Sequence, residues 1–380
     1  MSVTRILGQV VGVPTLNRYD RLSNLLQSLV NSSTWPEKLI IVDNGRKLGK
    51  LGEMPFPVEV ITPDYNIGVA ASWNCIGRLS RGNTVLVNDD FTLAGDALGR
   101  LDKMTEPISH NEATRYSCFH VTQEFWQKVG EFDEGFWPGN YEDTDIEVRA
   151  KRLGIPINIF ADSLGDHTDG KASQRHGDYT YLFDRNQRRF NAKWLNQKEA
   201  WGGNKPDELE WTFSDYRQHS PDSGMFFDVL RRLANQNQKV VEFGTGSGHT
   251  GIAFIAGKPK EFVSYDLVSR PGTQLIYHLR GQTSVRIEIG NVLEIEPIEA
   301  DLLFVDDLHT ADNVFIELSR HAKGVRRGIL LHDIVAWGET GEDGKPGIIY
   351  GIKRFLEEHL EWCVGEEDRQ WPGLMLLRRS

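Results

Sequence analysis

Residues 240–251 read VVEFGTGSGHTG: an apolar run, then a glycine-rich turn, then the first residues of a helix. Glycines let the backbone come close to a bound molecule, because they carry no Cβ and adopt left-handed conformations at little cost. The next apolar run, EFVSYD, ends on Asp266, about twenty residues after the turn. A carboxylate at that distance can bind the two hydroxyls of a ribose. The stretch therefore predicts a nucleotide-cofactor site, and both dinucleotides and S-adenosylmethionine fit it.

Apolar runs rich in β-branched residues lie on both sides of this turn, separated by helix-length segments. They occupy 239–243, 261–266, 285–290, 301–306 and 328–333. Strands that alternate with helices are typical of an α/β layer structure with a parallel sheet. We therefore expect an α/β block that begins near residue 225.

A second set of apolar runs fills the N-terminal part of the chain. The runs at 9–13, 39–42, 58–61 and 84–87 are β-rich and bounded by polar or turn residues, as buried parallel strands are. Between the first two, the segment at 20–30 places Leu22, Leu25, Leu26 and Leu29 on one helical face. This order predicts a βαβ unit.

The length of 380 residues exceeds the size at which one hydrophobic core usually stops growing, so two domains are expected. A composition of 39% hydrophobic and 26% charged residues is typical of a globular protein. The segment WGGNKPDE at 201–208 joins a glycine pair to a proline, as linkers do. We therefore predict domains at 1–204 and 205–380.

The net charge of −11 argues against a protein that coats nucleic acid through its general surface. Cys75, Cys118 and Cys363 are widely spaced and odd in number, which predicts neither a disulfide framework nor a zinc site and favours the reducing cytoplasm. The apolar run near the N-terminus is too short for a membrane span.

The stretch LVNDDF at 86–91 ends an N-terminal strand on Asn88, Asp89 and Asp90. Open α/β sheets bind ligands at the carboxyl ends of their strands. A carboxylate pair there can hold Mg²⁺ or Mn²⁺ against a diphosphate, because hard cations take oxygen ligands. The spacing alone leaves open a second interpretation, a turn with solvated acids.

Residues 8–200 resemble the family 2 glycosyltransferases of the GT-A type. The resemblance rests on six pieces in order: VVGVPTLNRYDRL, LIIVDNG, NIGVAASWNCIG, VLVNDD, EFDEGFWPGNYEDTDIEVRAKRLG and RRFNAKW. It implies that Asp43 contacts the base of a nucleotide sugar and that Asn66 and Gly68 shape the donor site. It also implies that Asp90 binds the metal. Asn88 stands where the family often has a first aspartate, which puts strict metal dependence in question.

Glu142, Asp143 and Asp145 open a helix in the same region, where acids also stabilise the helix dipole. The family resemblance implies that Asp143 is the general base that deprotonates an acceptor hydroxyl. It also implies that His167 reaches the metal or the diphosphate, although a lone histidine is more often structural.

A basic stretch follows at 171–194, interleaved with aromatic residues. Its cations are Lys171, Arg175, Arg185, Arg188, Arg189 and Lys193. Acceptor or phosphate binding is one interpretation. We prefer an amphipathic helix with a solvated basic face and an aromatic core stripe.

Residues 215–380 resemble the class I S-adenosylmethionine-dependent methyltransferases, whose motif I has the E-x-G-x-G-x-G form. The matching residues here are Glu242, Gly244, Gly246 and Gly248. The resemblance implies that Asp266 binds the ribose and that Asn291 lies where the adenine is read.

The last two strands narrow the resemblance to the group that contains cephalosporin-hydroxylase-like proteins and metal-dependent sugar O-methyltransferases. In that group a D-x-x-H element supplies a metal ligand and a general base, here Asp306 and His309. An acidic pair after the next strand completes the metal site, and His332 and Asp333 stand there. Histidine still permits coordination but favours softer metals than Mg²⁺.

These patterns predict a GT-A domain that transfers a sugar from a nucleotide sugar and a Rossmann-like domain that methylates a hydroxyl. The acceptor would be a glycan, a protein or a small molecule, and the sequence does not decide among them. One alternative is that one half is a binding module without catalysis. Another is that the C-terminal half is a hydroxylase or a dinucleotide enzyme.

Overall fold

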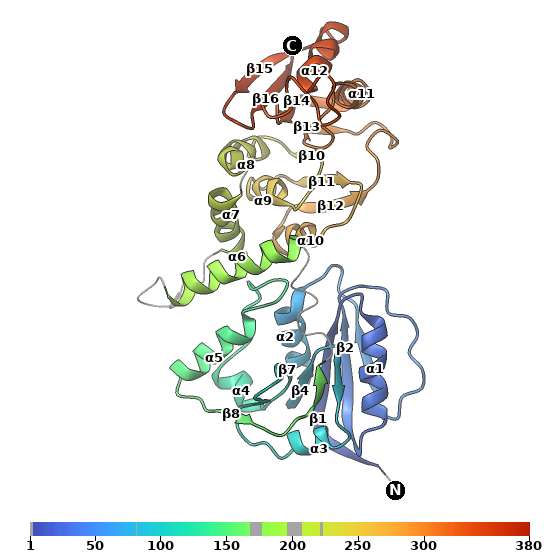
Figure 1. Ribbon diagram of the computed structural model, residues 1–380, viewed down its shortest axis with the longest axis vertical. Coiled ribbons are helices and arrows are strands. Elements are labelled where there is room, and N and C mark those ends of the chain that lie inside the picture. The colour runs from blue at the N-terminus through green and yellow to red at the C-terminus, as the bar shows by residue number, and fades with distance from the viewer. Residues whose placement is uncertain (1–2, 81, 168–176, 196–206, 221–222) are drawn as a thin grey trace. The chain divides into compact units, whose positions relative to one another are not determined.

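The computed structural model describes residues 3–80, 82–167, 177–195, 207–220 and 223–380. The chain divides into two compact units, Met1–Ala200 and Trp201–Ser380 (Figure 1). The predicted boundary at residue 204, together with Lys171 and Arg175, lies outside the described residues. None of the helices in the described ranges has the length and apolar character that a membrane crossing requires.

The N-terminal unit is built around a seven-stranded mixed sheet in the order β3-β2-β1-β4-β7-β6-β8. Its strands are β1 (Thr4–Thr15), β2 (Thr34–Asp43), β3 (Val58–Ile61), β4 (Asn83–Val87), β6 (Ile108–Asn111), β7 (Arg115–Val121) and β8 (Ile157–Phe160), with a separate pair β5 (Phe91–Leu93) and β9 (Gly165–His167). Its helices are α1 (Tyr19–Val30), α2 (Gly68–Ser80), α3 (Ala97–Leu101), α4 (Gln123–Lys128), α5 (Glu142–Arg152) and α6 (Gly177–Trp194). All four predicted strands are present, and the predicted βαβ unit is confirmed by the parallel pairing of β1 with β2.

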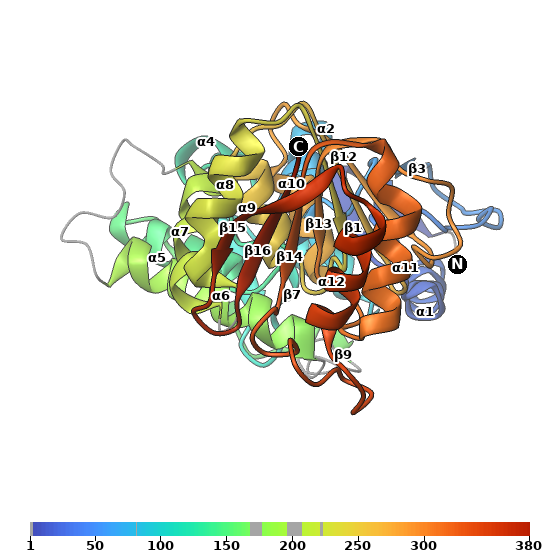
Figure 2. The ribbon, with the colours of Figure 1, turned by 90° about the horizontal axis from the view of Figure 1, so that it is seen from above.

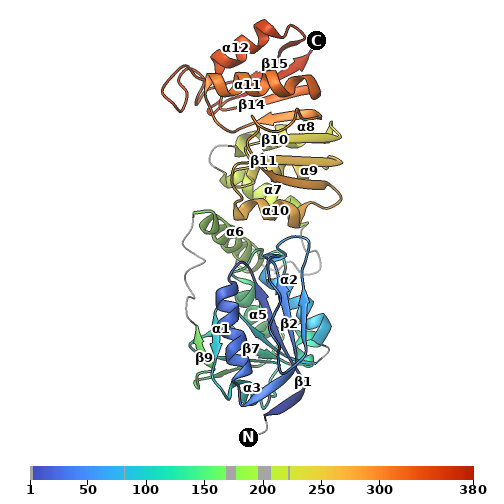
Figure 3. The ribbon, with the colours of Figure 1, turned by 90° about the vertical axis from the view of Figure 1, so that its right-hand side faces the viewer.

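Alternation along the strands gives this sheet two apolar faces, because successive side chains of a strand point to opposite sides. Val11 of β1 packs in the cluster that contains α1 and α3, whereas Val10 packs in the cluster that contains α2, α4 and α5. Figures 1 and 3 show α1 and α2 on opposite sides of the sheet. The helices therefore cover both faces and leave the strand ends for ligands.

Helix α6 departs from the prediction of a solvated basic face. Arg185 and Arg189 are fully buried, and Arg189 donates two hydrogen bonds to Asp133, at 3.0 and 3.1 Å. Lys193 contacts Asp133 at 2.7 Å and Asp145 at 2.6 Å. The prediction failed because these buried carboxylates come from distant segments, and helix periodicity does not report them.

The C-terminal unit contains a second seven-stranded sheet in the order β12-β11-β10-β13-β14-β16-β15. Its strands are β10 (Lys239–Phe243), β11 (Glu261–Asp266), β12 (Ser284–Ile289), β13 (Ala300–Val305), β14 (Val325–His332), β15 (Trp362–Asp368) and β16 (Leu374–Arg379). Its helices are α7 (Glu208–His219), α8 (Phe227–Asn235), α9 (His249–Ala256), α10 (Pro271–Leu279), α11 (Ala311–His321) and α12 (Ile348–Glu358), with short 3₁₀ turns η2 (Gly224–Phe226) and η3 (Ala322–Gly324). The first five strands pair in parallel, and β16 is antiparallel to both of its neighbours.

Helices cover both faces of this sheet as well. Figure 2 shows α7, α8 and α9 on one side and α11 and α12 on the other. Phe254 of α9 packs edge-on against Phe304 of β13 at 5.2 Å between ring centroids. Val314 of α11 and Phe355 of α12 pack with Phe243 of β10 in the opposite core cluster. All five predicted strands are present, and the two-domain α/β fold class is confirmed.

The Asp133 ion pairs give a stability prediction. We expect Asp133→Ala to lower the free energy of unfolding by about 3 kcal/mol, because it leaves the buried guanidinium of Arg189 without its carboxylate. Urea denaturation followed by circular dichroism measures the change. Glu131→Ala is the matched control, since its pair with Arg78 is exposed and contributes about 1 kcal/mol or less. Equal losses in the two variants would contradict the assignment.

Candidate active sites

A cavity of 840 Å³ opens at the carboxyl ends of the central strands of the N-terminal sheet. Among the predicted residues, those that line it are Asn66, Gly68, Asn88, Asp90, Asp143 and His167. Asp43 is not among its lining residues. Strand order reverses between β1 and β4, which is where open α/β sheets bind their ligands. The structure thus gathers six of the seven predicted N-terminal residues at one cavity.

Asp90 and His167 meet although 77 positions separate them. Strand β9 pairs with β5 so that His167 lies opposite Phe91, and His167 Nε2 is 3.0 Å from Asp90 Oδ1. Burial would raise the pKa of Asp90, but the hydrogen bond to His167, the charges of His167 and Arg18 and a backbone hydrogen bond together lower it. An ionised carboxylate beside an imidazole is a suitable pair of metal ligands.

Asp89, the other member of the carboxylate pair that the sequence analysis places after β4, also lines the cavity. Its Oδ2 accepts a hydrogen bond from the Thr15 hydroxyl at 2.7 Å. Burial and the neighbouring charge of Asp90 raise the pKa of Asp89 to about 6, against the opposing effect of Thr15. The pKa values of the two carboxyl groups are therefore shifted in opposite directions. Asp90, whose pKa is lowered, is the one better suited to hold a cation near neutral pH.

Asp43 lies behind the cavity, where it organises the loop that follows β2. Its side chain is 2% exposed and accepts hydrogen bonds from the Tyr19 hydroxyl at 2.8 Å and from the backbone N–H of Leu48 at 2.9 Å. The next residue, Asn44, lines the cavity instead. The role of Asp43 in base contact stays a prediction, and its visible role is to fix this loop.

Asn66 and Gly68 form the turn into α2. Asn66 Oδ1 accepts from the backbone N–H of Gly68 at 2.9 Å. Gly68 has a φ of +81°, and a Cβ there would lie 2.8 Å from the Trp137 ring. Only glycine fits this close approach, which keeps the cavity wall in place.

Glu142 and Asp143 begin α5 at the rim of the same cavity. Asp143 Oδ1 accepts from the backbone N–H of Thr144 at 2.7 Å, so the carboxylate caps the helix that carries it. Glu142 is 6% exposed, and its Oε2 has no hydrogen-bond partner. Burial, aided by the charges of Asp143 and Asp145, raises the pKa of Glu142 well above its usual value. Asp143 therefore bonds to the first turn of its own helix and also lines the cavity, so both interpretations of this residue stay open.

In the C-terminal unit the glycine-rich turn follows β10 and leads into α9. Gly244, Gly246 and Gly248 all have positive φ, and a Cβ on Gly244 would lie 1.9 Å from the carbonyl oxygen of Asp306. Asp266 Oδ2 accepts from the backbone N–H of Gly246 at 2.9 Å. The turn and the predicted ribose-binding acid are therefore adjacent, as the sequence spacing predicts.

Glu242 lies beneath this turn rather than in the cavity. It is fully buried and accepts hydrogen bonds from the hydroxyls of Thr250 and Ser264, both at 2.5 Å. Burial raises the pKa of Glu242 to about 7, although both hydroxyls oppose the shift. Glu242 thus ties β10, β11 and α9 together. Its contact with a cofactor stays a prediction.

Asn291 follows β12 and caps the turn that it begins. Its Oδ1 accepts from the backbone N–H of Leu293 at 3.0 Å, and its Nδ2 donates to Glu294 at 3.0 Å. The exposed apolar side chains of Leu267 and Ile289 lie at the ends of the neighbouring strands β11 and β12. An apolar edge beside a side-chain amide is suited to a purine.

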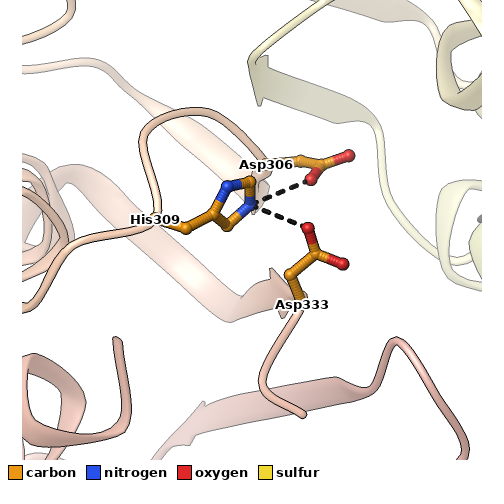
Figure 4. A group of neighbouring side chains, drawn as sticks. All are labelled: Asp306, His309 and Asp333. Carbon is orange, nitrogen blue, oxygen red and sulfur yellow. Dashed lines mark ion pairs between the residues drawn. The ribbon is translucent and has the colours of Figure 1, made fainter. Parts of the chain in front are cut away.

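Asp306, His309 and Asp333 form a compact group at the ends of β13 and β14 (Figure 4). His309 Nε2 lies 3.4 Å from Asp306 Oδ1 and 3.2 Å from Asp333 Oδ2. Among the described residues this is the only set of three histidine, cysteine, aspartate or glutamate side chains whose potential ligand atoms all lie within 4.8 Å of one another. Two carboxylates and an imidazole suit Mn²⁺ or a similar divalent ion, so the residues fit the predicted metal.

His332 lies below these carboxylates and contacts both. Its Nδ1 is 3.1 Å from Asp306 Oδ1 and 3.1 Å from Asp333 Oδ1, and its ring is 4% exposed between Phe226 and Phe304. These contacts suit His332 to orient the two carboxylates. Direct ligation by His332 stays a prediction.

Glu342 completes the cluster from the loop after β14, and no local sequence pattern predicts its contact with His309. His309 Nδ1 is 2.6 Å from Glu342 Oε1. Burial would lower the pKa of His309, but hydrogen bonds to Asp306 and Glu342 raise it to about 9. Burial would also lower the pKa of His332, but the charges of Asp306 and Asp333 and the hydrogen bonds to both together raise it to about 10. Without a bound cation, both rings are therefore protonated at neutral pH.

A cavity of 330 Å³ joins the glycine turn to this cluster. Its described lining residues include Gly244, Gly246, Asp306, His332 and Asp333. Strand order reverses between β10 and β13, so this site also lies at the switch point of its sheet.

No family model matches the chain, and no curated protein matches it. Solved structures similar to about half of the chain include an O-methyltransferase from Bacillus cereus in complex with SAH. It is 16% identical, with a TM-score of 0.36, and the match covers 50% of this chain and 96% of that one. The O-methyltransferase TomG from Streptomyces achromogenes, in complex with SAM, is 17% identical, with a TM-score of 0.34 and coverage of 51% and 95%.

One glycosyltransferase is also similar in structure. The mannosyltransferase PcManGT from Pyrobaculum calidifontis, in complex with GDP-Man and Mn²⁺, is 14% identical with a TM-score of 0.39. The match covers 53% of this chain and 66% of that one. Likenesses this distant carry no argument about activity, which therefore rests on the residues themselves.

The protonated state of His309 gives a pH prediction for metal binding. A divalent ion competes with the proton on His309, so we expect Mn²⁺ affinity to rise about tenfold per pH unit between pH 6 and pH 8. Isothermal titration calorimetry in buffers of different ionisation enthalpy measures both affinity and proton release. Asp306→Asn should remove the C-terminal site and its pH dependence. A pH-independent affinity would contradict the arrangement.

Proposed function

We propose that this protein is a transferase with two activities. The N-terminal domain transfers a glycosyl group from a nucleotide sugar to a hydroxyl acceptor, and the C-terminal domain methylates a hydroxyl with S-adenosylmethionine. The observation that carries the proposal is the Asp306–His309–Asp333 cluster, whose two carboxylates line one cavity with a glycine turn of the nucleotide-binding form. A ligand cluster and a cofactor turn in one cavity are what a metal-assisted transferase requires.

In the N-terminal cavity, Asp143 would accept the proton of the acceptor hydroxyl as its oxygen attacks the anomeric carbon of the donor. Asp90 and His167 would hold a divalent ion, which when bound supplies positive charge for the leaving diphosphate. Asn66 and Gly68 would shape the wall against the donor. Glu142, which also lines the cavity, would hydrogen-bond the acceptor beside Asp143.

In the C-terminal cavity, Asp306 and Asp333 would hold the cation that acidifies the acceptor hydroxyl when bound. S-adenosylmethionine supplies the electrophilic methyl group. His309 would take the hydroxyl proton, the new O–CH₃ bond forms as the S–CH₃ bond breaks, and Glu342 keeps the imidazole oriented. Asp266 would bind the ribose, and Asn291 the adenine. His309 can act as a base only when neutral, a state that positive charge in the cluster favours.

A second candidate function has a specific observation in its favour. No set of three mutually close metal ligands occurs among the described residues of the N-terminal unit. That domain would then bind a sugar nucleotide or glycan without turnover and position it. The two readings differ in whether Asp143 is needed for glycosyl transfer.

Ligand-induced stabilisation tests both sites without an acceptor, because a ligand that binds only the native state raises its stability by mass action. We expect one nucleoside diphosphate with Mn²⁺ to raise the melting temperature, and S-adenosylmethionine or its demethylated product to do so independently. Differential scanning fluorimetry of the full chain is the measurement. A response to only one ligand class would remove the two-activity proposal.

Separate substitutions test which domain performs which step. We expect Asp143→Asn to lower glycosyl transfer by at least about a hundredfold and His309→Ala to lower methyl transfer similarly, because each removes a general base. Release of nucleoside diphosphate and of S-adenosylhomocysteine measures the two reactions. Each variant is the control for the other, since each leaves the second site intact. Unchanged nucleotide-sugar turnover in Asp143→Asn would favour the binding-module reading.

A further inference from the structure

A short backbone segment, residues 137–141, joins the two sides of the N-terminal cavity. On the side of the proposed donor, Trp137 Nε1 donates to the carbonyl oxygen of Asn66 at 2.9 Å. The carbonyl oxygen of Pro138 accepts from the N–H of Val69 at 2.8 Å. At its other end the segment leads into α5, which carries the proposed general base. A displacement of the last residues of this segment would therefore move the base relative to the donor wall.

The last two residues of the segment have an unfavourable backbone conformation. Asn140 has a φ of +75° and Tyr141 a φ of +74°. The left-handed region costs free energy for residues other than glycine, so two such residues in a row need support from their surroundings. The carbonyl oxygen of Tyr141 accepts a hydrogen bond from the N–H of Asp145 at 2.9 Å, in the first turn of α5. The direction in which α5 begins, and with it the position of Asp143, thus depends on this strained backbone.

Helix α6 supports the segment through the side chain of Asn186, which is fully buried. Its Nδ2 donates to the carbonyl oxygens of Trp137, Gly139 and Asn140, at 3.2, 2.8 and 3.4 Å. Arg185 Nη1 donates to Asn186 Oδ1 at 2.8 Å, which fixes the amide with its nitrogen toward the segment. One side chain therefore binds three of the segment's five carbonyl groups.

The ring of Tyr141 also packs against α6. Its centroid lies 5.3 Å from that of Phe183 and 5.5 Å from that of Phe190. Tyr141 and Phe183 line the same cavity as Asp143. The aromatic contacts place the ring of Tyr141, whereas the amide of Asn186 holds the backbone on which α5 begins.

We propose that Asn186 is a positioning residue of the N-terminal site, which holds the start of α5 so that Asp143 faces the donor. Trp137 and Pro138 have their own hydrogen bonds to the donor wall. Loss of the Asn186 amide should therefore displace the base and leave donor binding unchanged. This inference rests on the proposed glycosyl transfer and concerns the residue that acts through its base.

Steady-state turnover of nucleotide sugars by the full chain tests the proposal. The unmodified chain is assayed with UDP-, GDP- and dTDP-hexoses and Mn²⁺ for release of nucleoside diphosphate, with water and methyl hexosides as acceptors. The donor that turns over fastest is then used for the variants. We expect Asn186→Ala to lower kcat at least about tenfold, because a displacement of about 1 Å can cost about a hundredfold. The KM for the donor should stay within about threefold, since the donor wall keeps its bonds.

A double substitution distinguishes positioning from a general loss of structure. Because Asn186 acts through Asp143, the variant that combines Asp143→Asn with Asn186→Ala should have a kcat within about threefold of Asp143→Asn alone. Independent effects would multiply instead. If Asn186→Ala does not fold, Asn186→Ser, which keeps one shorter donor, takes its place in the same comparison.

Gln9→Ala is the matched control within the same domain. Gln9 is also a fully buried amide, and its Nε2 donates to the carbonyl oxygen of Leu98 at 3.2 Å. It pairs with Asn83, the first residue of β4, and so lies at the end of the sheet opposite the cavity. Gln9→Ala should lower the melting temperature and leave kcat unchanged.

Three results would each overturn the inference. They are an unchanged kcat in Asn186→Ala, a loss that lies entirely in KM, and a double variant whose loss equals the product of the two single losses. If the unmodified chain releases nucleoside diphosphate while one of these results holds, only this inference fails. If it releases none from any of these donors, the glycosyl-transfer proposal fails, and this inference fails with it.

Discussion

Both candidate sites depend on the same topological constraint, the reversal of strand order in the middle of each sheet. Adjacent parallel strands β1 and β4, and likewise β10 and β13, send their connections to opposite faces, so no helix covers the crevice at their carboxyl ends. Residues that follow these strands therefore lie at the crevice where a ligand can bind. Asp89 and Asp90 follow β4, and Asp306 follows β13, in the same structural position of two different sheets.

In the C-terminal domain this constraint also joins the cofactor turn to the acidic cluster. Gly244 and Asp306 follow neighbouring strands, and a Cβ on Gly244 would lie 1.9 Å from the carbonyl oxygen of Asp306. A larger residue at 244 would separate the turn from the cluster. The absence of one side chain thus allows the glycine turn and the acidic cluster to share a cavity. Buried Glu242 holds the same turn from below through Thr250 and Ser264.

The parts of the fold that depend on local, periodic patterns can be predicted from the sequence, whereas contacts between distant segments cannot. The nine predicted strands and the glycine turn are local patterns, and all are present. The pairing of β5 with β9, which brings His167 to Asp90, depends on a three-residue strand that no periodicity marks. Glu342 reaches His309 from a loop with no regular pattern. The helical pattern predicts that Arg189 is solvated, because it does not show the buried partner Asp133.

The two sites differ in how much of their chemistry is assembled before a ligand binds. In the C-terminal cluster, two carboxylates and two imidazoles already neutralise one another, and Glu342 adds a further hydrogen bond to His309. A cation entering there replaces protons, so little reorganisation of side chains is needed. The N-terminal site offers Asp90 and His167 with Asn88 beside them, and the remaining ligands must come from the diphosphate or water. We therefore propose that metal binding at the C-terminal site is a property of the chain, whereas at the N-terminal site it would require the donor. In that proposal the nucleotide sugar would supply the negative charge that Asn88, in place of an acid, does not.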